Sequence, residues 1–205
     1  MRTFGVGVLG LHEGRTMLGA LTRTRHARAV AACDINPVKI AEARARYPDI
    51  FYTTSFDDLL GHPEVDIVAI FTPDQLHGEH IVRAFAAGKH VICTKPLVNT
   101  VADARRILEA SRESKGKLLV GQSTRFFEPF LRQRRDYERG KIGDVELVDA
   151  HYIHRMDWFY DKSPWATSAT DWVFLGLSHP VDLVYWYLGP IVSVHARGAR
   201  SALAE

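Results

Sequence analysis

The chain is 205 residues long, and its 26 Lys and Arg residues nearly balance its 24 Asp and Glu residues, leaving a formal net charge of +2. We expect no nucleic-acid or membrane partner, because positive charge is not in excess and no apolar run nears the roughly 20 residues of a membrane helix. The length exceeds one usual domain and falls short of two, which indicates one domain and part of another.

The N-terminal residues run directly into an apolar strand that contains glycine, without the cleavage site of a secretory leader. We therefore interpret the chain as a mature, cytoplasmic protein. Its two cysteines, Cys33 and Cys93, each end an apolar run, so we expect packed free thiols in a reducing compartment. No metal site is expected, since the pair His77 and His80 lacks an added carboxylate cluster.

Short apolar runs alternate with helical patterns over the first part of the chain, which is typical of a parallel sheet with helices on both faces. Helix starts are indicated at Pro37, Ser55 and Thr100. We predict an α/β fold, a doubly wound parallel Rossmann sheet in a dinucleotide-binding domain over 1–121. About six strands are expected, with clear patterns at 6–9, 28–33, 65–71, 89–93 and 117–120.

The chain changes character after a predicted boundary near Gly121-Gln122. A charged helix is expected over 125–139, an alternating strand over 145–153, an amphipathic helix over 181–188 and a further strand over 191–196. We predict an incomplete α+β domain over 122–205, for substrate binding or oligomerisation. A sheet with so few strands has an unpaired edge and little core.

The loop after the first strand is a candidate phosphate site. Gly10 follows the strand and Gly14 opens the next helix, where a tight turn lets backbone N–H groups approach a pyrophosphate. A full G-x-G-x-x-G motif from Gly10 would need glycine at His12 and Arg15, so phosphate binding and a plain strand-to-helix connection remain equally open. Arg15 either contacts a phosphate or is a solvated helix residue.

Asp34 ends the second strand, 24 residues after Gly10. This is close to the spacing expected of the carboxylate that binds the adenosine ribose, and it favours NAD. Asn36 and Lys39 follow closely and leave room for NADP. The alternative is that Asp34 caps the turn before Pro37.

Two further segments lie at the carboxyl ends of predicted strands, where open parallel sheets bind their ligands. Thr72-Pro73 and then His77 follow one strand, and Lys95-Pro96 follows the next. A lysine partly removed from water there has a lowered pKa and can exchange a proton with a substrate oxygen. The alternative is an ordinary surface lysine in a loop.

These segments resemble those of the Gfo/Idh/MocA oxidoreductases. Thr72-Pro73 with His77 matches the T-P-x-x-x-H segment of that family, and 87–96 matches A-G-K-H-V-x-x-E-K-P. The resemblance continues over 121–126, 140–143 and 179–189, and so covers nearly all of the chain. It implies NAD or NADP as cofactor. Together with the loop positions and spacing above, it predicts cofactor contacts from Gly10, Gly14, Arg15, Asp34, Thr72, Pro73, His77, Lys95 and Pro96.

The resemblance also implies that Lys95 and His179 are catalytic and flank the substrate. We expect Arg125 and Asp182 to take part in substrate binding, with Asp182 orienting His179 or capping its helix. Helical spacing places His179, Asp182 and Trp186 on one face, and Val181, Val184 and Leu188 on the other. We predict that the apolar face packs and that the other looks into a cleft. The alternative for His179 is a plain helix cap.

The sequence departs from the family at particular positions. The aspartate that the family usually has four residues before the histidine is Leu175 here, and the glutamate of E-K-P is Thr94. Asp157 and Asp171 are candidate carboxylates in the same stretch. Family members run to well over 300 residues, so we interpret this chain as a fragment, a truncated product or a chain completed by a partner.

The sequence thus predicts an NAD(P)-dependent oxidoreductase acting on CH–OH groups. It would transfer a hydride between the cofactor and a secondary alcohol of a sugar, cyclitol or polyol, and would form a homo-oligomer if its second domain were completed. One alternative is a non-catalytic dinucleotide-binding sensor or scaffold. Another is a methyltransferase, which fits the first strand and Asp34 but leaves Thr72-Pro73 and Lys95-Pro96 without a role.

Overall fold

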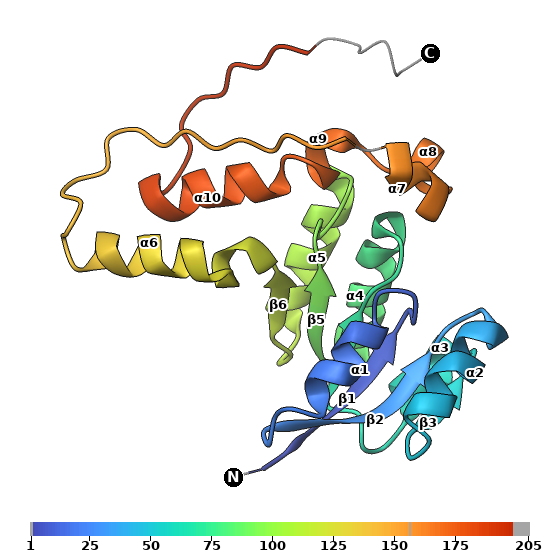
Figure 1. The fold of residues 1–205 in the computed structure, drawn as a ribbon. Coiled ribbons are helices and arrows are strands. Elements are labelled where there is room, and N and C mark those ends of the chain that lie inside the picture. Colours follow the sequence, from blue (N-terminus) through green and yellow to red (C-terminus); the bar gives the residue numbers. More distant parts are fainter. Residues whose placement is uncertain (1, 156, 199–205) are drawn as a thin grey trace. The chain divides into compact units, whose positions relative to one another are not determined.

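A computed structural model describes residues 2–155 and 157–198, with the side chain of Asp157 left out (Figure 1). The described chain divides into two compact units. The first comprises 2–122 and 154–178, and the second comprises 123–153 and 179–198. The chain therefore enters the second unit after Gln122, returns to the first at His154, and leaves it again after Ser178.

The first unit holds a six-stranded sheet in the order β3-β2-β1-β4-β5-β6, with the paired strands parallel. This is the strand order of dinucleotide-binding sheets, and it confirms the predicted Rossmann fold. The strands are β1 (Phe4–Leu9), β2 (Ala27–Cys33), β3 (Phe51–Thr53), β4 (Ile67–Ile70), β5 (His90–Thr94) and β6 (Leu118–Gly121). Strand β3 has only three residues, too few for an alternating pattern to be read from sequence.

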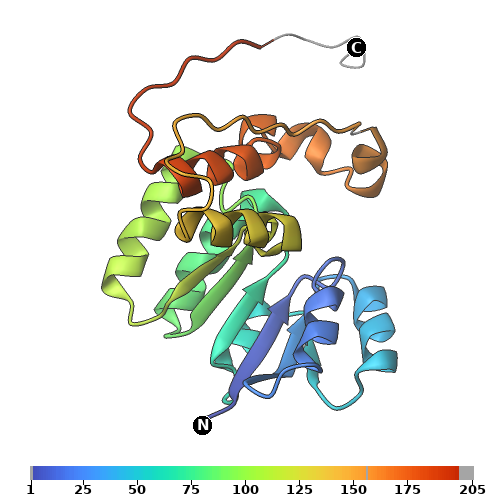
Figure 2. The same ribbon diagram turned by 60° about the vertical axis from the view of Figure 1, so that its left-hand side comes forward.

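Five helices connect the strands and lie on both faces of the sheet, as Figures 1 and 2 show. Their starts agree with the expected capping: the side chains of Asn36, Ser55 and Thr100 each accept a hydrogen bond from a backbone N–H of the first turn. The helices are α1 (Arg15–Leu21), α2 (Pro37–Arg46), α3 (Phe56–Gly61), α4 (His77–Ala86) and α5 (Val101–Glu113), with a 3-10 turn η1 (Asp74–Leu76) before α4.

Side chains point alternately to the two faces of the sheet along each strand, and the buried residues form one hydrophobic cluster on each face. Val6 and Val8 of β1 pack with residues of α1 and α2, whereas Val68 and Ile70 of β4 pack with residues of α3, α4 and α5. Both cysteines are buried free thiols, as predicted. Burial raises the pKa of Cys33 to about 11 and also raises the pKa of Cys93, so neither thiol ionises near neutral pH.

The strand register brings the candidate site residues to one edge. Leu9 pairs with Cys33 on one side and with Ile70 on the other, and Ile70 pairs with Cys93. The four strands β2, β1, β4 and β5 therefore end at the same level. The segments that begin at Gly10, Asp34, Phe71 and Lys95 leave the sheet side by side.

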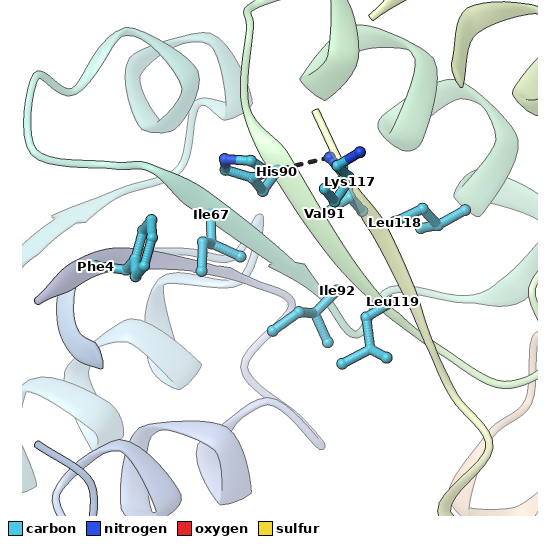
Figure 3. A pocket seen from close by; sticks show the side chains of 8 residues that line it. All are labelled: Phe4, Ile67, His90, Val91, Ile92, Lys117, Leu118 and Leu119. Carbon is cyan, nitrogen blue, oxygen red and sulfur yellow. Dashed lines mark hydrogen bonds between the residues drawn. The ribbon is translucent and has the colours of Figure 1, made fainter. Parts of the chain in front are cut away.

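A hollow of about 280 Å³ opens over the sheet, towards the amino ends of the strands (Figure 3). It is lined by Phe4 of β1, Ile67 of β4, residues of β5 and β6, and Lys117, whose backbone N–H donates to His90 Nδ1 at 3.1 Å. Its wall is almost entirely apolar. Because ligands of open parallel sheets bind at the opposite edge, we do not place the active site here.

Three short helices follow His154: α7 (Asp157–Lys162), α8 (Ala166–Ala169) and α9 (Trp172–Leu175). The segment 154–178 belongs to the first unit although it follows the predicted boundary near Gly121-Gln122. Side-chain contacts explain this placement. Asn99 Nδ2 donates to the carbonyl of Ala169 at 2.7 Å, and Phe174 packs against the core cluster under α4 and α5.

The second unit contains a 3-10 turn η2 (Ser123–Phe126), helix α6 (Glu128–Glu138) and most of helix α10 (Ser178–Leu188). The strands predicted over 145–153 and 191–196 are wrong for the described chain, where neither segment pairs with a neighbour. A strand needs hydrogen-bonded partners, and here the alternating residues face solvent: Leu147 is 84% exposed and Val192 is 97% exposed. In the described residues, no helix is both long and apolar enough to span a bilayer.

Replacing Gly10 by alanine should destabilise the first unit. Gly10 has a φ of +87°, and a Cβ there would lie 2.8 Å from the carbonyl carbon of Phe71. The control is Gly88→Ala, which has a similar φ of +71° but nothing within 4 Å of its Cβ. We expect Gly88→Ala to lower the free energy of unfolding by about 1–2 kcal/mol and Gly10→Ala to lower it further, as measured by urea denaturation. Equal losses would contradict the close approach.

Candidate active site

The loop after β1 is held close to the end of β4. A Cβ on Gly14 would lie 2.2 Å from the carbonyl oxygen of Gly10, so both positions exclude side chains. Arg15 begins α1 with an exposed side chain; its Nε donates to the carbonyl of His12 at 3.2 Å. The loop therefore exposes backbone that a bulky ligand group can approach, with one guanidinium beside it.

Asp34 joins two loops at the end of β2. One of its carboxylate oxygens accepts from the backbone N–H of Leu11 at 2.6 Å, and the other accepts from that of Asn36 at 2.8 Å. The alternative role of Asp34, capping the turn before Pro37, is therefore present. It does not exclude ribose binding, because each carboxylate oxygen can accept more than one hydrogen bond and the side chain is only partly buried.

His77 is almost fully buried, at 1% exposure. Its Nδ1 lies 2.9 Å from the carbonyl oxygen of Pro96, and its Nε2 lies 2.8 Å from that of Thr72. The ring thus ties the end of the Thr72-Pro73 loop to the Lys95-Pro96 turn, where the peptide bond is cis. We expect His77 to serve the cofactor site by holding these two loops, because both ring nitrogens face the backbone.

His80 is a neutral neighbour of the same loop. Its Nδ1 lies 3.0 Å from Thr72 Oγ1, and its ring meets the edge of Phe56 at 5.0 Å. Burial lowers the pKa of His80 to about 4, so the ring carries no charge near neutral pH. Its contact with Thr72 fixes the hydroxyl beside the strand edge.

Lys95 follows β5 directly and is half-buried. Its ammonium donates to the carbonyl oxygen of Leu175 in α9 at 3.3 Å. Burial lowers the pKa of Lys95, and the carboxylate of Asp74 acts in the opposite direction. A lysine held in this way, at the strand edge shared with Gly10 and Asp34, differs from a solvated loop lysine.

The segment 154–178 makes polar contacts along the same edge. Lys162 of α7 donates to Glu13 in the glycine loop at 2.6 Å, a hydrogen bond that lowers the pKa of Glu13. Thr170 Oγ1 donates to the buried carboxylate of Asp74. Sequence reasoning missed Asp74; the available signal was an acidic residue directly after Thr72-Pro73 at the end of a strand.

The other candidate carboxylates of this segment have different placements. Asp171 caps α9, since its Oδ1 accepts from the backbone N–H of Val173 at 2.7 Å. The side chain of Asp157 lies outside the described part of the structure. The side chain of Leu175 is buried, and only its carbonyl oxygen meets Lys95.

In the second unit, His179 lines a hollow of about 310 Å³ with Thr124, Tyr152 and residues of α6 and α10. Its Nδ1 lies 2.8 Å from Thr124 Oγ1, and its ring stacks at a tilt on Tyr152, with the centroids 5.9 Å apart. A histidine fixed by a hydroxyl on the wall of a hollow lined by both apolar and polar residues can exchange protons with a ligand there.

Arg125 and Asp182 bind each other. The Nε and a terminal nitrogen of Arg125 donate to the two oxygens of Asp182 at 2.6 and 2.7 Å, and the guanidinium lies 5.1 Å from the ring of Trp186. The predicted division of α10 is therefore wrong at Asp182 and Trp186, although His179 on the same face does line a hollow. Asp182 and Trp186 are packed against Arg125, because paired charges can be buried when their hydrogen bonds are satisfied. Val181 and Leu188 are instead 49% and 45% exposed.

The residues at the strand edge of the first unit fit a dinucleotide. Gly10 and Gly14 form a cradle that a Cβ would fill, and Asp34 ends β2 with acceptor capacity for hydroxyl groups. Thr72 lies after β4 and Lys95 after β5, the two strands that follow β1 in the order of the sheet. The fold and this donor set define a dinucleotide-binding domain.

The chain belongs to the Gfo/Idh/MocA family of oxidoreductases. Residues 4–122 match the family model described as "Oxidoreductase family, NAD-binding Rossmann fold", and residues 130–204 match the one described as "GFO/IDH/MocA C-terminal domain". The family resemblance found in the motifs is thereby confirmed, and so is the NAD-binding character of the first domain.

Individual relatives agree with this assignment. Inositol 2-dehydrogenase 1 of Saccharopolyspora erythraea is 33% identical over 97% of this chain and 57% of its own length. The structure of scyllo-inositol dehydrogenase from Lactobacillus casei, with bound NAD(H) and scyllo-inositol, has a TM-score of 0.81 at 25% identity over 92% of this chain and 57% of that one. WlbA dehydrogenase from Bordetella pertussis, with NADH and UDP-GlcNAcA, gives 0.80 at 25%, over 92% and 59%. The chain thus spans about half the length of the relatives it matches.

Removing the carboxylate of Asp182 should destabilise the second unit. Its side chain is 16% exposed, and its loss leaves the Arg125 guanidinium without the carboxylate that accepts its two hydrogen bonds. We expect Asp182→Ala to lower the free energy of unfolding by about 1.5–3 kcal/mol in urea denaturation. The control is Glu138→Ala, which removes a more exposed partner of Arg134 and should lower it by less than about 1 kcal/mol. Similar losses in both variants would contradict a special contribution from the Arg125 pair.

Proposed function

We propose that this chain belongs to an NAD-dependent dehydrogenase that interconverts a secondary alcohol of a cyclitol or sugar with the ketone. The observation that carries the proposal is the half-buried Lys95 at the strand edge that also bears Gly10 and Asp34. Its substrate class is supported by relatives that are named as inositol dehydrogenases or hold scyllo-inositol or UDP-GlcNAcA. These relatives do not favour a non-catalytic sensor or scaffold.

Cofactor binding would involve the residues of the first unit. Gly10 and Gly14 let the backbone approach a pyrophosphate. Arg15 is exposed beside them, with its guanidinium 3.6 Å from Glu42, and would turn to meet the phosphate charge. Asp34 would accept from the ribose hydroxyls and repel a 2′-phosphate, which favours NAD over NADP. Thr72, Pro73 and the Lys95-Pro96 turn would border the nicotinamide end.

Bound NAD supplies the carbon that accepts a hydride from the alcohol. The chain's own residues then have to take the hydroxyl proton, because oxidation breaks one C–H and one O–H bond. The neutral amine of Lys95 is suited to accept that proton, and its ammonium returns the proton in the reverse direction. Following the family resemblance, we propose that His179 shares this single proton transfer with Lys95; Thr124 orients its ring on the wall of a hollow.

The remaining parts of the proposal concern the setting of the reaction. We propose a cytoplasmic enzyme, supported by two buried, unpaired cysteines that suit a reducing compartment. We also propose a homo-oligomer, supported by apolar residues such as Leu147 and Val192 that stay exposed in the described second unit. Arg125 and Asp182 would shape the substrate site as a pair.

Lys95→Met should abolish most turnover and leave the cofactor bound. We expect the rate of NADH formation from a panel of inositols and sugars to fall by about 10²–10⁴-fold, because the proton acceptor is lost. Binding of NADH, followed by its fluorescence, should weaken far less than turnover falls, because the glycine loop and Asp34 remain in place. The control is Lys89→Met, at the opposite end of β5, where the amine donates to the carbonyl of Val65 at 2.8 Å. Undiminished turnover in Lys95→Met would contradict the proposal.

Alcohol oxidation should become faster as the pH rises. The reactive form of Lys95 in that direction is the neutral amine, and burial lowers its pKa, so the neutral fraction grows at lower pH than for a lysine in water. Ketone reduction needs the ammonium and should slow over the same range. Profiles of kcat/KM against pH in both directions test this. Two profiles that move in the same direction would exclude Lys95 as the titrating group.

A further inference from the structure

Asp74 is a buried acid that the proposed proton transfer does not use directly. It opens η1 immediately after Thr72-Pro73 and is 3% exposed. One carboxylate oxygen accepts from Thr170 Oγ1, while Oδ1 has no hydrogen-bond partner among the described residues. An ionised carboxylate with an unsatisfied oxygen is unfavourable in the interior unless a positive charge lies near.

The positive charge that interacts electrostatically with Asp74 is that of Lys95. The ammonium of Lys95 and the carboxylate of Asp74 are bound by the same short segment: Thr170 donates to Asp74, and the carbonyl of Leu175 accepts from Lys95. Strands β4 and β5, which precede the two residues, are neighbours in the sheet. The electrostatic effect of Asp74 on Lys95 favours the ammonium form and opposes the effect of burial.

Other ionisable groups around the pair are engaged elsewhere. His77 is held between two backbone carbonyls, and burial keeps the ring of His80 neutral. Asp171 caps α9, and Asp34 binds two backbone N–H groups. On α5, Asp103 pairs with Arg106 at 2.9 Å.

We propose that Asp74 is a positioning residue for Lys95: its buried carboxylate, fixed by Thr170, provides the counter-charge that holds the Lys95 ammonium at the carboxyl edge of β5. Asp74 acts through Lys95 and touches no reacting atom. The inference rests on the proposed function for its catalytic meaning, but the electrostatic pairing itself can be measured without substrate or cofactor. Without Asp74, burial acts alone on Lys95, so the amine should lose its proton at lower pH.

The test is a titration of Lys95 in the whole chain. Lysines are dimethylated with ¹³C-formaldehyde, and the Lys95 signal is identified by its absence from Lys95→Arg. We expect the NMR titration midpoint of Lys95 to move to lower pH in Asp74→Asn, which keeps the shape of the side chain and its acceptor for Thr170. In the control Asp171→Asn, which removes a nearby charge but retains a capping side chain, the midpoint should stay at the wild-type value.

A folded Asp74→Asn variant with an unchanged midpoint would overturn the proposal, and so would an equal shift in Asp171→Asn. Thr170→Val provides a second variant if Asp74→Asn does not fold, and it should give a smaller shift in the same direction; no shift in that variant would count against the proposal. In active protein, the limb of the pH–rate profile assigned to Lys95 should move with the NMR midpoint. If the midpoint shifts but no variant or wild type oxidises a polyol, the pairing stands and the proposed function fails.

Discussion

The common register of β2, β1, β4 and β5 is the constraint on which the candidate site depends. Parallel strands that end together deliver their following residues to one edge, however far apart they lie in the sequence. Leu9, Cys33, Ile70 and Cys93 are the paired residues that set this level. The glycine loop, Asp34, the Thr72-Pro73 loop and Lys95 are neighbours because of it. Gly10 adds a second requirement, since only a residue without a side chain lets the first loop pass the end of β4.

The segment 154–178 completes that edge with contacts made by only a few residues. Lys162 reaches the glycine loop, Thr170 reaches Asp74, and the carbonyl of Leu175 receives the Lys95 ammonium. These contacts make the segment part of the first unit and place it against the loops at the carboxyl ends of the strands. The environment of Lys95 is therefore set by residues about 80 positions later in the chain as well as by its own strand.

Much of the first unit was predictable from sequence because its signals are local. Apolar runs, the caps at Ser55 and Thr100 and the glycines of the first loop each depend on a few neighbouring residues, and the structure confirms them. The failures involve long-range partners. The alternation of apolar and polar residues over 145–153 predicts a strand, but a strand forms only if another strand pairs with it. Similarly, the helical spacing of α10 could not reveal that Arg125 would neutralise Asp182 and turn the polar face inward.

The two hydrogen bonds that hold Asp34 have a consequence for changing cofactor preference. On the proposed role of Asp34 at the ribose, a protein engineer who wants to admit a 2′-phosphate would replace this carboxylate with a small or basic residue. Here that exchange would also leave the N–H groups of Leu11 and Asn36 without their acceptor and would loosen two loops at once. A conversion from NAD to NADP would therefore have to supply a new anchor for both loops together with the new phosphate contact.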